Sequence, residues 1–215
     1  MKEIERVSFD FEDALLSLDR LKSREILTDA VKINSQLQTI EKVVVPALER
    51  IGKDWEEGKT ALSQIYMTGR ICESLIDEIL PTESSKRRNT PKMAIAVLDD
   101  YHMLGKRIVY SILRASGFGV LDLGRVTAQE AIIRTIDDNI QILLISTLML
   151  PSALSIKDVK QGLKRSGKNI KIIAGGAPFR YDDQLGPEVG ADAYARQASD
   201  AIDIINAFNK KPNNF

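Results

Sequence analysis

The sequence predicts two domains of different class: an all-α four-helix bundle over residues 1–82 and an α/β domain over residues 92–215. Three observations support this division. Apolar residues recur with helical spacing from about residue 9 to about residue 80. A stretch without apolar side chains follows, and after it short β-type runs alternate with amphipathic segments. Such alternation is typical of a parallel sheet with helices on both faces.

The first half contains four helical patterns joined by short connections. Ser8 is placed to cap the first helix, whose apolar positions are Phe11, Ala14, Leu15 and Leu18. The other three helices are expected over residues 23–33, 35–53 and 59–80. Consecutive helices of these lengths predict a small antiparallel bundle.

Residues 81–91 have the composition of a connecting segment. They include two prolines and five Ser, Thr or Asn residues. Such a stretch disfavours regular structure. We therefore predict a linker at residues 83–91, followed by the second domain.

The second half predicts a flavodoxin-like (Rossmann-type) domain with a five-stranded parallel sheet. Strands are expected at residues 93–98, 118–123, 140–145, 170–174 and, weakly, 191–195. Helices are expected at residues 105–116, 128–137, 156–166 and 198–208, with a short uncertain piece at 182–189. In the common strand order 2-1-3-4-5, the loops after strands one, three and four meet at the carboxyl edge. These loops are residues 100–105, 146–152 and 175–177.

His102, the single histidine of the chain, lies in the first of these loops. Asp100, two residues earlier, is placed to orient the imidazole and to fix its tautomer, which leaves the other ring nitrogen for a metal or a proton. A loop histidine that merely caps a helix is the alternative. Ser146 and Ser152 are strand-end or helix-cap hydroxyls when considered alone. Gly175 and Gly176 either admit a ligand close to the backbone or form a plain turn.

Several other classes of function fit the sequence poorly. The 30 basic and 30 acidic residues show no strong positive patch for nucleic acid. The chain has no P-loop, no Gly-x-Ser-x-Gly motif and no ligand set for a protein-only zinc site. A receiver domain would need an aspartate where Ser146 stands. No apolar run is long enough to span a bilayer and the N-terminus lacks a signal peptide, so we expect a cytoplasmic protein.

A lone histidine at a switch-point crevice suits a metal that arrives inside a macrocycle. Three motifs at this edge, Asp100-x-His102-x-x-Gly105, Ser146-x-Leu148 and Gly175-Gly176, resemble the fingerprint of cobalamin-binding domains. The first half resembles the helical cap module of methionine synthase and of the small corrinoid proteins of methyltransferase systems. The cap segments that carry this resemblance are Pro46–Gly52, Trp55–Gly58 and Leu62–Gln64.

The resemblance implies a bound cobalamin, as methylcobalamin or a related corrinoid, with His102 as the lower axial ligand of cobalt. It implies that Asp100 hydrogen-bonds His102 and that Ser152 continues this relay to solvent. The slot for the nucleotide tail would be lined by Ser146, Leu148, Gly175 and Gly176, with Met103 and Ala177 beside them. Gly105, Gly117 and Gly124 would let the loops close, and Trp55 and Leu62, with Ile65 as a weaker candidate, would cover the upper face.

The resemblance also implies a methyl carrier that is not catalytic alone. It would shuttle a methyl group between a substrate-specific methyltransferase and an acceptor methyltransferase, with a corrinoid reductive activator as a further partner. A cobalamin-binding sensory or regulatory protein is the main alternative, and a mutase subunit is a third. The few residues outside the two domains disfavour the sensory or regulatory protein, and the helical bundle disfavours the mutase subunit. Two positions depart from the pattern: Ser63 replaces a proline, and the loop at residues 126–128 lacks one.

Overall fold

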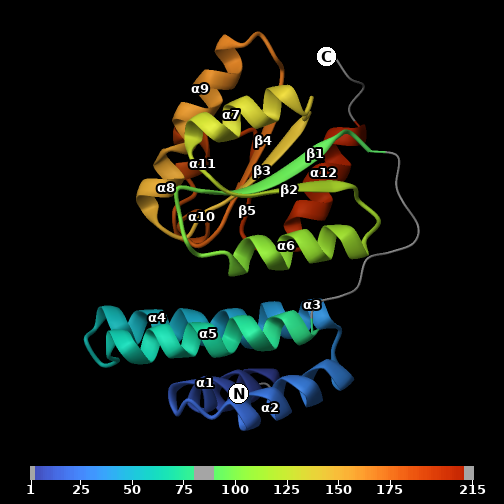
Figure 1. Cartoon of the computed structure of the whole chain (residues 1–215). Helices are drawn as coiled ribbons and strands as arrows, with labels where there is room; N and C mark the ends of the chain where they lie inside the picture. The colour runs from blue at the N-terminus through green and yellow to red at the C-terminus, as the bar shows by residue number, and fades with distance from the viewer. Residues whose placement is uncertain (1–2, 80–89, 211–215) are drawn as a thin grey trace. The chain divides into compact units, whose positions relative to one another are not determined.

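The computed structural model describes residues 3–79 and 90–210, which fall into two compact units, residues 1–81 and 82–215 (Figure 1). The predicted linker at residues 83–91 lies mostly outside the described residues. No helix in the described part of the chain is long and apolar enough to cross a membrane. The two units are described separately.

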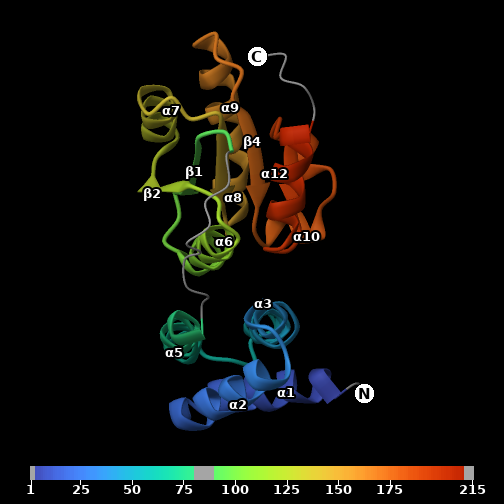
Figure 2. The ribbon, with the colours of Figure 1, turned by 90° about the vertical axis from the view of Figure 1, so that its right-hand side faces the viewer.

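The first unit is helical, as predicted. Its elements are α1 (Glu3–Leu16), α2 (Arg20–Ile33), α3 (Gln36–Thr39), a π-helical turn (Ile40–Val44), α4 (Val45–Glu56) and α5 (Leu62–Ile79). The segments from α3 to α4 form one continuous helical run. Figures 1 and 2 show α1 and α2 in one layer and α4 and α5 in the other. The fully buried side chains between the layers include Phe11, Leu15, Val44 and Ile76.

The expected capping role of Ser8 was wrong. Helix α1 begins at Glu3, and Ser8 lies buried within it, where its hydroxyl donates to the carbonyl oxygen of Val43 at 2.9 Å. That carbonyl belongs to the π-helical turn just before Pro46. Pro46 supplies no N–H to the turn that precedes it, and a π-helical turn is one way in which a helix accommodates such a proline. The caps that do form are Asp19 before α2 and Ser35 before α3.

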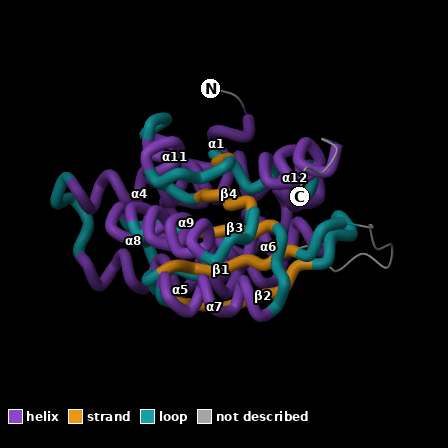
Figure 3. The backbone as a smooth tube through the Cα atoms, turned by 90° about the horizontal axis from the view of Figure 1, so that it is seen from above, coloured by secondary structure: helices purple, strands orange, loops and turns teal. Residues whose placement is uncertain are grey.

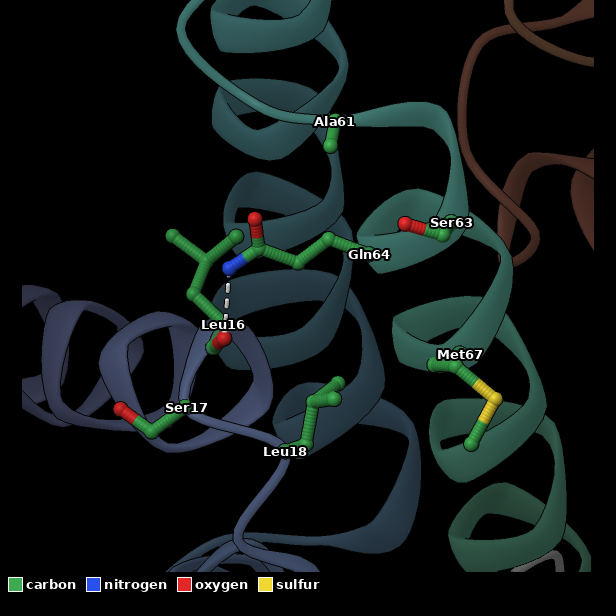
Figure 4. A pocket seen from close by; sticks show the side chains of 7 residues that line it. All are labelled: Leu16, Ser17, Leu18, Ala61, Ser63, Gln64 and Met67. Atoms are coloured by element: carbon green, nitrogen blue, oxygen red, sulfur yellow. Dashed lines mark hydrogen bonds between the residues drawn. The ribbon is translucent and has the colours of Figure 1, made fainter.

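The start of the fourth helix, expected at residue 59, lies at Leu62. Gln64 in its first turn donates from Nε2 to the backbone oxygen of Leu16 at 2.7 Å (Figure 4). This bond satisfies a carbonyl at the end of α1, which has no partner within its own helix. Around it lies a hollow of about 360 Å³ lined by residues of the α1 end and the α5 start: Leu16, Ser17, Leu18, Ala61, Ser63, Gln64 and Met67.

The second unit contains the predicted five-stranded sheet. Its strands are β1 (Met93–Leu98), β2 (Val120–Val126), β3 (Ile142–Ser146), β4 (Lys171–Gly175) and β5 (Ala193–Ala195). All pairings are parallel, in the order β2-β1-β3-β4-β5. Figure 3 shows β2, β1, β3 and β4 side by side in this order. The predicted strand order is therefore confirmed. The second strand lies two to three residues later than expected, because Asp122, Gly124 and Arg125 hide its apolar pattern.

Helices cover both faces of this sheet. They are α6 (Leu104–Ala115), α7 (Ala128–Asp137), α8 (Leu150–Leu154), α9 (Ile156–Arg165), α10 (Pro178–Tyr181), α11 (Leu185–Glu188) and α12 (Asp200–Lys210). The helices α6 and α12 close one core, and α7 with α9 closes the other. Two short helices replace the single uncertain piece at residues 182–189. Helix α8 was not expected, and it begins where Pro151 provides a favourable first-turn residue.

Candidate functional site

The three loops expected to converge do so, because the strands that carry them are neighbours. In the sheet register Val97 lies opposite Ser146, and Ser146 lies opposite Gly175. The pairing continues one residue beyond the strands, since the Thr147 amide donates to the Gly175 carbonyl at 3.0 Å. The carboxyl ends of β1, β3 and β4 therefore form one contiguous edge.

Asp100 joins two of these loops. One carboxylate oxygen, Oδ1, accepts from the His102 amide at 3.1 Å and lies 2.5 Å from His102 Nδ1. The other, Oδ2, accepts from the amides of Leu148 and Met149 at 3.0 and 3.1 Å. Just before it, Asp99 adopts a left-handed φ of 46°, which turns the chain sharply at the end of β1. The loop after β1 is thus fastened to the loop after β3 through a single side chain.

The electrostatics of Asp100 favour its ionised form. Burial of the residue, which is 3% exposed, is the largest single influence and would raise the carboxyl pKa. The hydrogen bond from the His102 ring and those from the three backbone amides together outweigh burial and lower the pKa to about 2. Asp100 is therefore a carboxylate at neutral pH, held in place from both sides.

His102 is the exposed end of this arrangement. Its side chain is 54% exposed, whereas that of Asp100 is 2% exposed. An ionised carboxylate at Nδ1 favours the tautomer with the proton on Nδ1, so that Nε2 carries the lone pair. Within the described residues Nε2 has no hydrogen-bond partner. An oriented imidazole with a free, solvent-facing nitrogen is suited to bind a metal from outside the protein.

Two glycines allow close packing at this edge. Gly176 has a φ of 123°, and a Cβ there would lie 1.7 Å from the Thr147 carbonyl oxygen, so only glycine fits between the two backbones. At Gly105 a Cβ would lie 3.1 Å from Ser146 Oγ, which is a tight contact with a side chain.

The remaining predicted residues divide by location. Leu148 and Met149 are exposed in the loop after β3, and Met103 and Ala177 precede α6 and α10 as N-cap residues. Gly124 lies within β2, at a bulge. Gly117 is not brought to the site, because it precedes β2 and so lies toward the opposite edge of the sheet. Trp55 lies near the end of α4 and Leu62 begins α5, in the other unit; their side chains are outside what the structure describes.

The expected hydrogen bond between Ser152 and Asp100 is not formed. Ser152 is buried in the first turn of α8, and its hydroxyl donates to the Asp99 carbonyl oxygen at 3.4 Å. The physical reason is the unexpected helix, which turns the hydroxyl toward the backbone of β1's end. The Oδ2 atom of Asp100 already accepts two amide hydrogen bonds.

Sequence reasoning missed two contacts beside the site. The Arg125 guanidinium lies 3.7 Å from the centre of the Tyr101 ring, which is 77% exposed next to His102. Lys106, directly after Gly105, is buried and ion-paired with Asp122. The sequence does place a lysine in the first turn of the helix after His102. It does not show which residue that lysine contacts, because its partner lies in another element.

Comparison with known proteins agrees with this geometry. A family model described as "B12 binding domain" matches residues 92–205, and a second model of the same description matches residues 8–80. Monomethylamine corrinoid protein 1 of Methanosarcina mazei is 32% identical over 180 residues, which cover 79% of this chain and 82% of that protein.

Two solved structures from Methanosarcina barkeri share the fold. The monomethylamine corrinoid protein has a TM-score of 0.77 and 28% identity, with 90% of this chain and 94% of that chain covered. The methanol:cobalamin methyltransferase complex has a TM-score of 0.53 and 21% identity, with 99% of this chain and 82% of that chain covered. At the latter identity the likeness shows the fold alone.

Fold and site together define a corrinoid-binding protein. The chain belongs to the B12 binding domain family, and the relatives that it resembles are named as corrinoid proteins. The class, the fold and the cofactor predicted from the sequence are thereby confirmed. The residues at the edge fit such a cofactor on their own evidence, since an imidazole held by a buried carboxylate offers Nε2 to a metal.

Proposed function

We propose that this chain holds a corrinoid at the carboxyl edge of its sheet through His102 and carries a methyl group between a substrate-specific methyltransferase and an acceptor methyltransferase. The observation that carries the proposal is the buried Asp100 carboxylate, which orients a half-exposed imidazole whose Nε2 is free. When bound, the corrinoid supplies a cobalt ion that accepts and gives up a methyl group. The protein contributes a ligand whose position and protonation it controls.

Asp100 performs two tasks in this proposal. It restricts the imidazole to one orientation, because the carboxylate is itself fixed by the amides of Leu148 and Met149. Its pKa of about 2 also keeps it ionised, so it can hold the Nδ1 proton whenever Nε2 serves as a ligand. The Asp100–His102 pair would thus present Nε2 to a metal in a fixed orientation and a fixed tautomer.

We further propose which neighbours contact the cofactor. Ser146, Leu148, Gly175 and Gly176 would line the slot for the nucleotide tail, and their place at the carboxyl ends of β3 and β4, beside the loop that holds Asp100, supports this assignment. Gly105 would let the loops close around the tail. Met103, Ala177 and Gly124 would lie at its margin. The contact of Trp55 and Leu62 with the upper face of the corrinoid remains a prediction. The domain boundary at residues 83–91 and the cytoplasmic location also remain predictions.

The partners are proposed at two levels of detail. Methyltransferases as a class follow from the family relationship. A methylated amine as the methyl donor is supported by relatives named for monomethylamine, dimethylamine and trimethylamine. A reductive activator of oxidised cobalt is a further expected partner.

The test is the absorption spectrum of the full chain reconstituted with methylcobalamin. We expect a histidine-ligated spectrum for the wild type and a base-off spectrum for His102→Ala. Asp192→Asn, which changes an aspartate near the other edge of the sheet, serves as the control and should match the wild type. A wild-type protein that retains no corrinoid at micromolar concentrations, or a His102→Ala spectrum equal to the wild type, would contradict the proposal.

A further inference from the structure

Lys106 occupies a place that is unfavourable for a lysine. It is the third residue of α6, within the first turn, where the helix dipole disfavours a positive charge. Its side chain is only 4% exposed, and removing an ammonium group from water is costly without a close partner. A charge retained at such a position needs a compensating interaction and suggests a specific role.

The compensating interaction crosses to the edge strand. Lys106 Nζ lies 2.5 and 2.6 Å from the two carboxylate oxygens of Asp122 in β2. Asp122 also accepts from the Gly124 amide at 2.7 Å. The strand register shifts here, since Ile95 lies opposite Asp122 and Ala96 lies opposite Gly124. The bulge turns the strand locally and is tied to the lysine through the same carboxylate.

The segment between Asp100 and Lys106 is therefore held at both ends. Asp100 is fixed by the loop after β3, and Lys106 is fixed by β2. His102 lies between these two anchors. The intervening turn packs closely against the end of β3, since a Cβ added at Gly105 would lie 3.1 Å from Ser146 Oγ.

We propose that the Lys106–Asp122 pair is a positioning element that sets the first turn of α6 and thereby the place of His102 relative to the corrinoid. This inference rests on the proposed role of His102 as the cobalt ligand. The pair does not contact the imidazole, and it acts through the backbone of residues 103–105. Its loss should weaken histidine ligation more than it weakens the fold.

A second lysine–aspartate pair in the same unit supplies a matched control. Lys160 in α9 lies 2.5 Å from Asp192, the same separation as in the Lys106–Asp122 pair. Asp192 precedes β5 and therefore lies away from the carboxyl edge. Lys160→Met removes a lysine–aspartate contact of the same length without touching the loop that carries His102, although Asp192 keeps its contact with Lys171.

The experiment compares Lys106→Met, Lys106→Arg, Asp122→Asn and Lys160→Met in the full chain. Each is reconstituted with methylcobalamin, and the ratio of histidine-ligated to base-off spectrum is measured at neutral pH. We expect Lys106→Met to lower this ratio about tenfold, the size typical of losing a residue that orients a metal ligand. Lys160→Met should leave the ratio unchanged, and Lys106→Arg should restore most of it, because an arginine can still pair with Asp122.

A measurement without corrinoid tests the same proposal independently. Amide hydrogen exchange at residues 103–107 should become about tenfold faster in Lys106→Met, while exchange in α9 stays as in the wild type. If Lys106→Met does not fold, Asp122→Asn replaces it. This change removes the charge of the partner and leaves at most one bond to the lysine, so a smaller but measurable lowering of the ratio of histidine-ligated to base-off spectrum is expected.

The outcomes separate the two hypotheses. A wild-type protein without a histidine-ligated spectrum would overturn the proposed function. A ligated wild type with a ligated Lys106→Met or Asp122→Asn variant would overturn the positioning role alone. Equal loss of ligation in Lys106→Met and Lys160→Met would also overturn it, because the effect would then be one of general stability.

Discussion

Two aspartates in the α/β unit, Asp100 and Asp192, both accept hydrogen bonds from backbone amides but have different side-chain partners. Asp192, near the amino edge, contacts Lys160 and Lys171 and accepts from the Ile172 amide. Asp100, at the carboxyl edge, also accepts hydrogen bonds from backbone amides, but its side-chain partner is the half-exposed imidazole of His102. Burial acts to raise the pKa of both carboxyls, and in both the hydrogen bonds outweigh it.

The difference lies in what each network leaves available. Lysines are positive at neutral pH, so Asp192 forms a closed ion-pair cluster that ties α9 to β4 and β5. The imidazole beside Asp100 is half-exposed and, within the described residues, keeps its Nε2 without a hydrogen-bond partner. The comparison teaches that similar stabilisation of a carboxylate can be used for fastening elements together or for presenting a ligand.

The largest expected effect concerns the glycines of the two edges. Gly176→Ala should lower the free energy of unfolding by about 3 kcal/mol or more, because its Cβ would meet the Thr147 carbonyl oxygen at 1.7 Å. Gly190→Ala should cost about 1 kcal/mol, because only its φ of 73° is strained and the nearest side-chain atom lies at 3.4 Å. Urea unfolding of both variants measures the difference. Equal losses would show that the carboxyl edge is no more tightly packed than the amino edge.

The next effect separates the two aspartates by pH. Asp100→Asn should lower stability at pH 7 by about 1–2 kcal/mol, a value reduced for solvent screening. The Asp100 pKa falls from 3.8 in the unfolded chain to about 2 in the folded one, so its contribution is present above about pH 4 and is lost as the pH falls through about 2. Unfolding curves of wild type and variant should therefore converge between pH 5 and pH 2.

Asp192→Asn provides the parallel measurement for that pH series. Its carboxyl pKa is also lowered, so its contribution should likewise disappear in acid. Only the Asp100 variant should also alter the spectrum of bound corrinoid. A pH-independent gap between wild type and Asp100→Asn would contradict the hydrogen-bonding account of this site.

The smallest effect is expected at Ser152. Removing its 3.4 Å hydrogen bond to the Asp99 carbonyl in Ser152→Ala should cost about 0.5–1 kcal/mol. Because the hydroxyl does not contact the Asp100 carboxylate, the pH dependence of stability between pH 2 and pH 5 should stay as in the wild type. A shifted pH dependence would indicate that Ser152 reaches Asp100 in solution and belongs to its network.

Local interactions were the part of the site that the sequence determined. Asp100 and His102 are two residues apart, so a short loop suffices to bring them together. The spacing allowed their contact and the family resemblance implied it. The strand order followed from the alternation of buried runs with helices, which allows few connections. These features depend on neighbouring residues or on general rules of parallel sheets.

Tertiary structure decided the contacts between distant segments. The Lys106–Asp122 pair, the bond from Ser152 to Asp99 and the bond from Ser8 to Val43 join residues 16, 53 and 35 positions apart. A serine hydroxyl or a lysine amine has no partner preference that its own segment encodes. Which carbonyl or carboxylate it contacts depends on where helices begin, where a strand has a bulge and how the elements pack. These features are set only when the whole core is assembled.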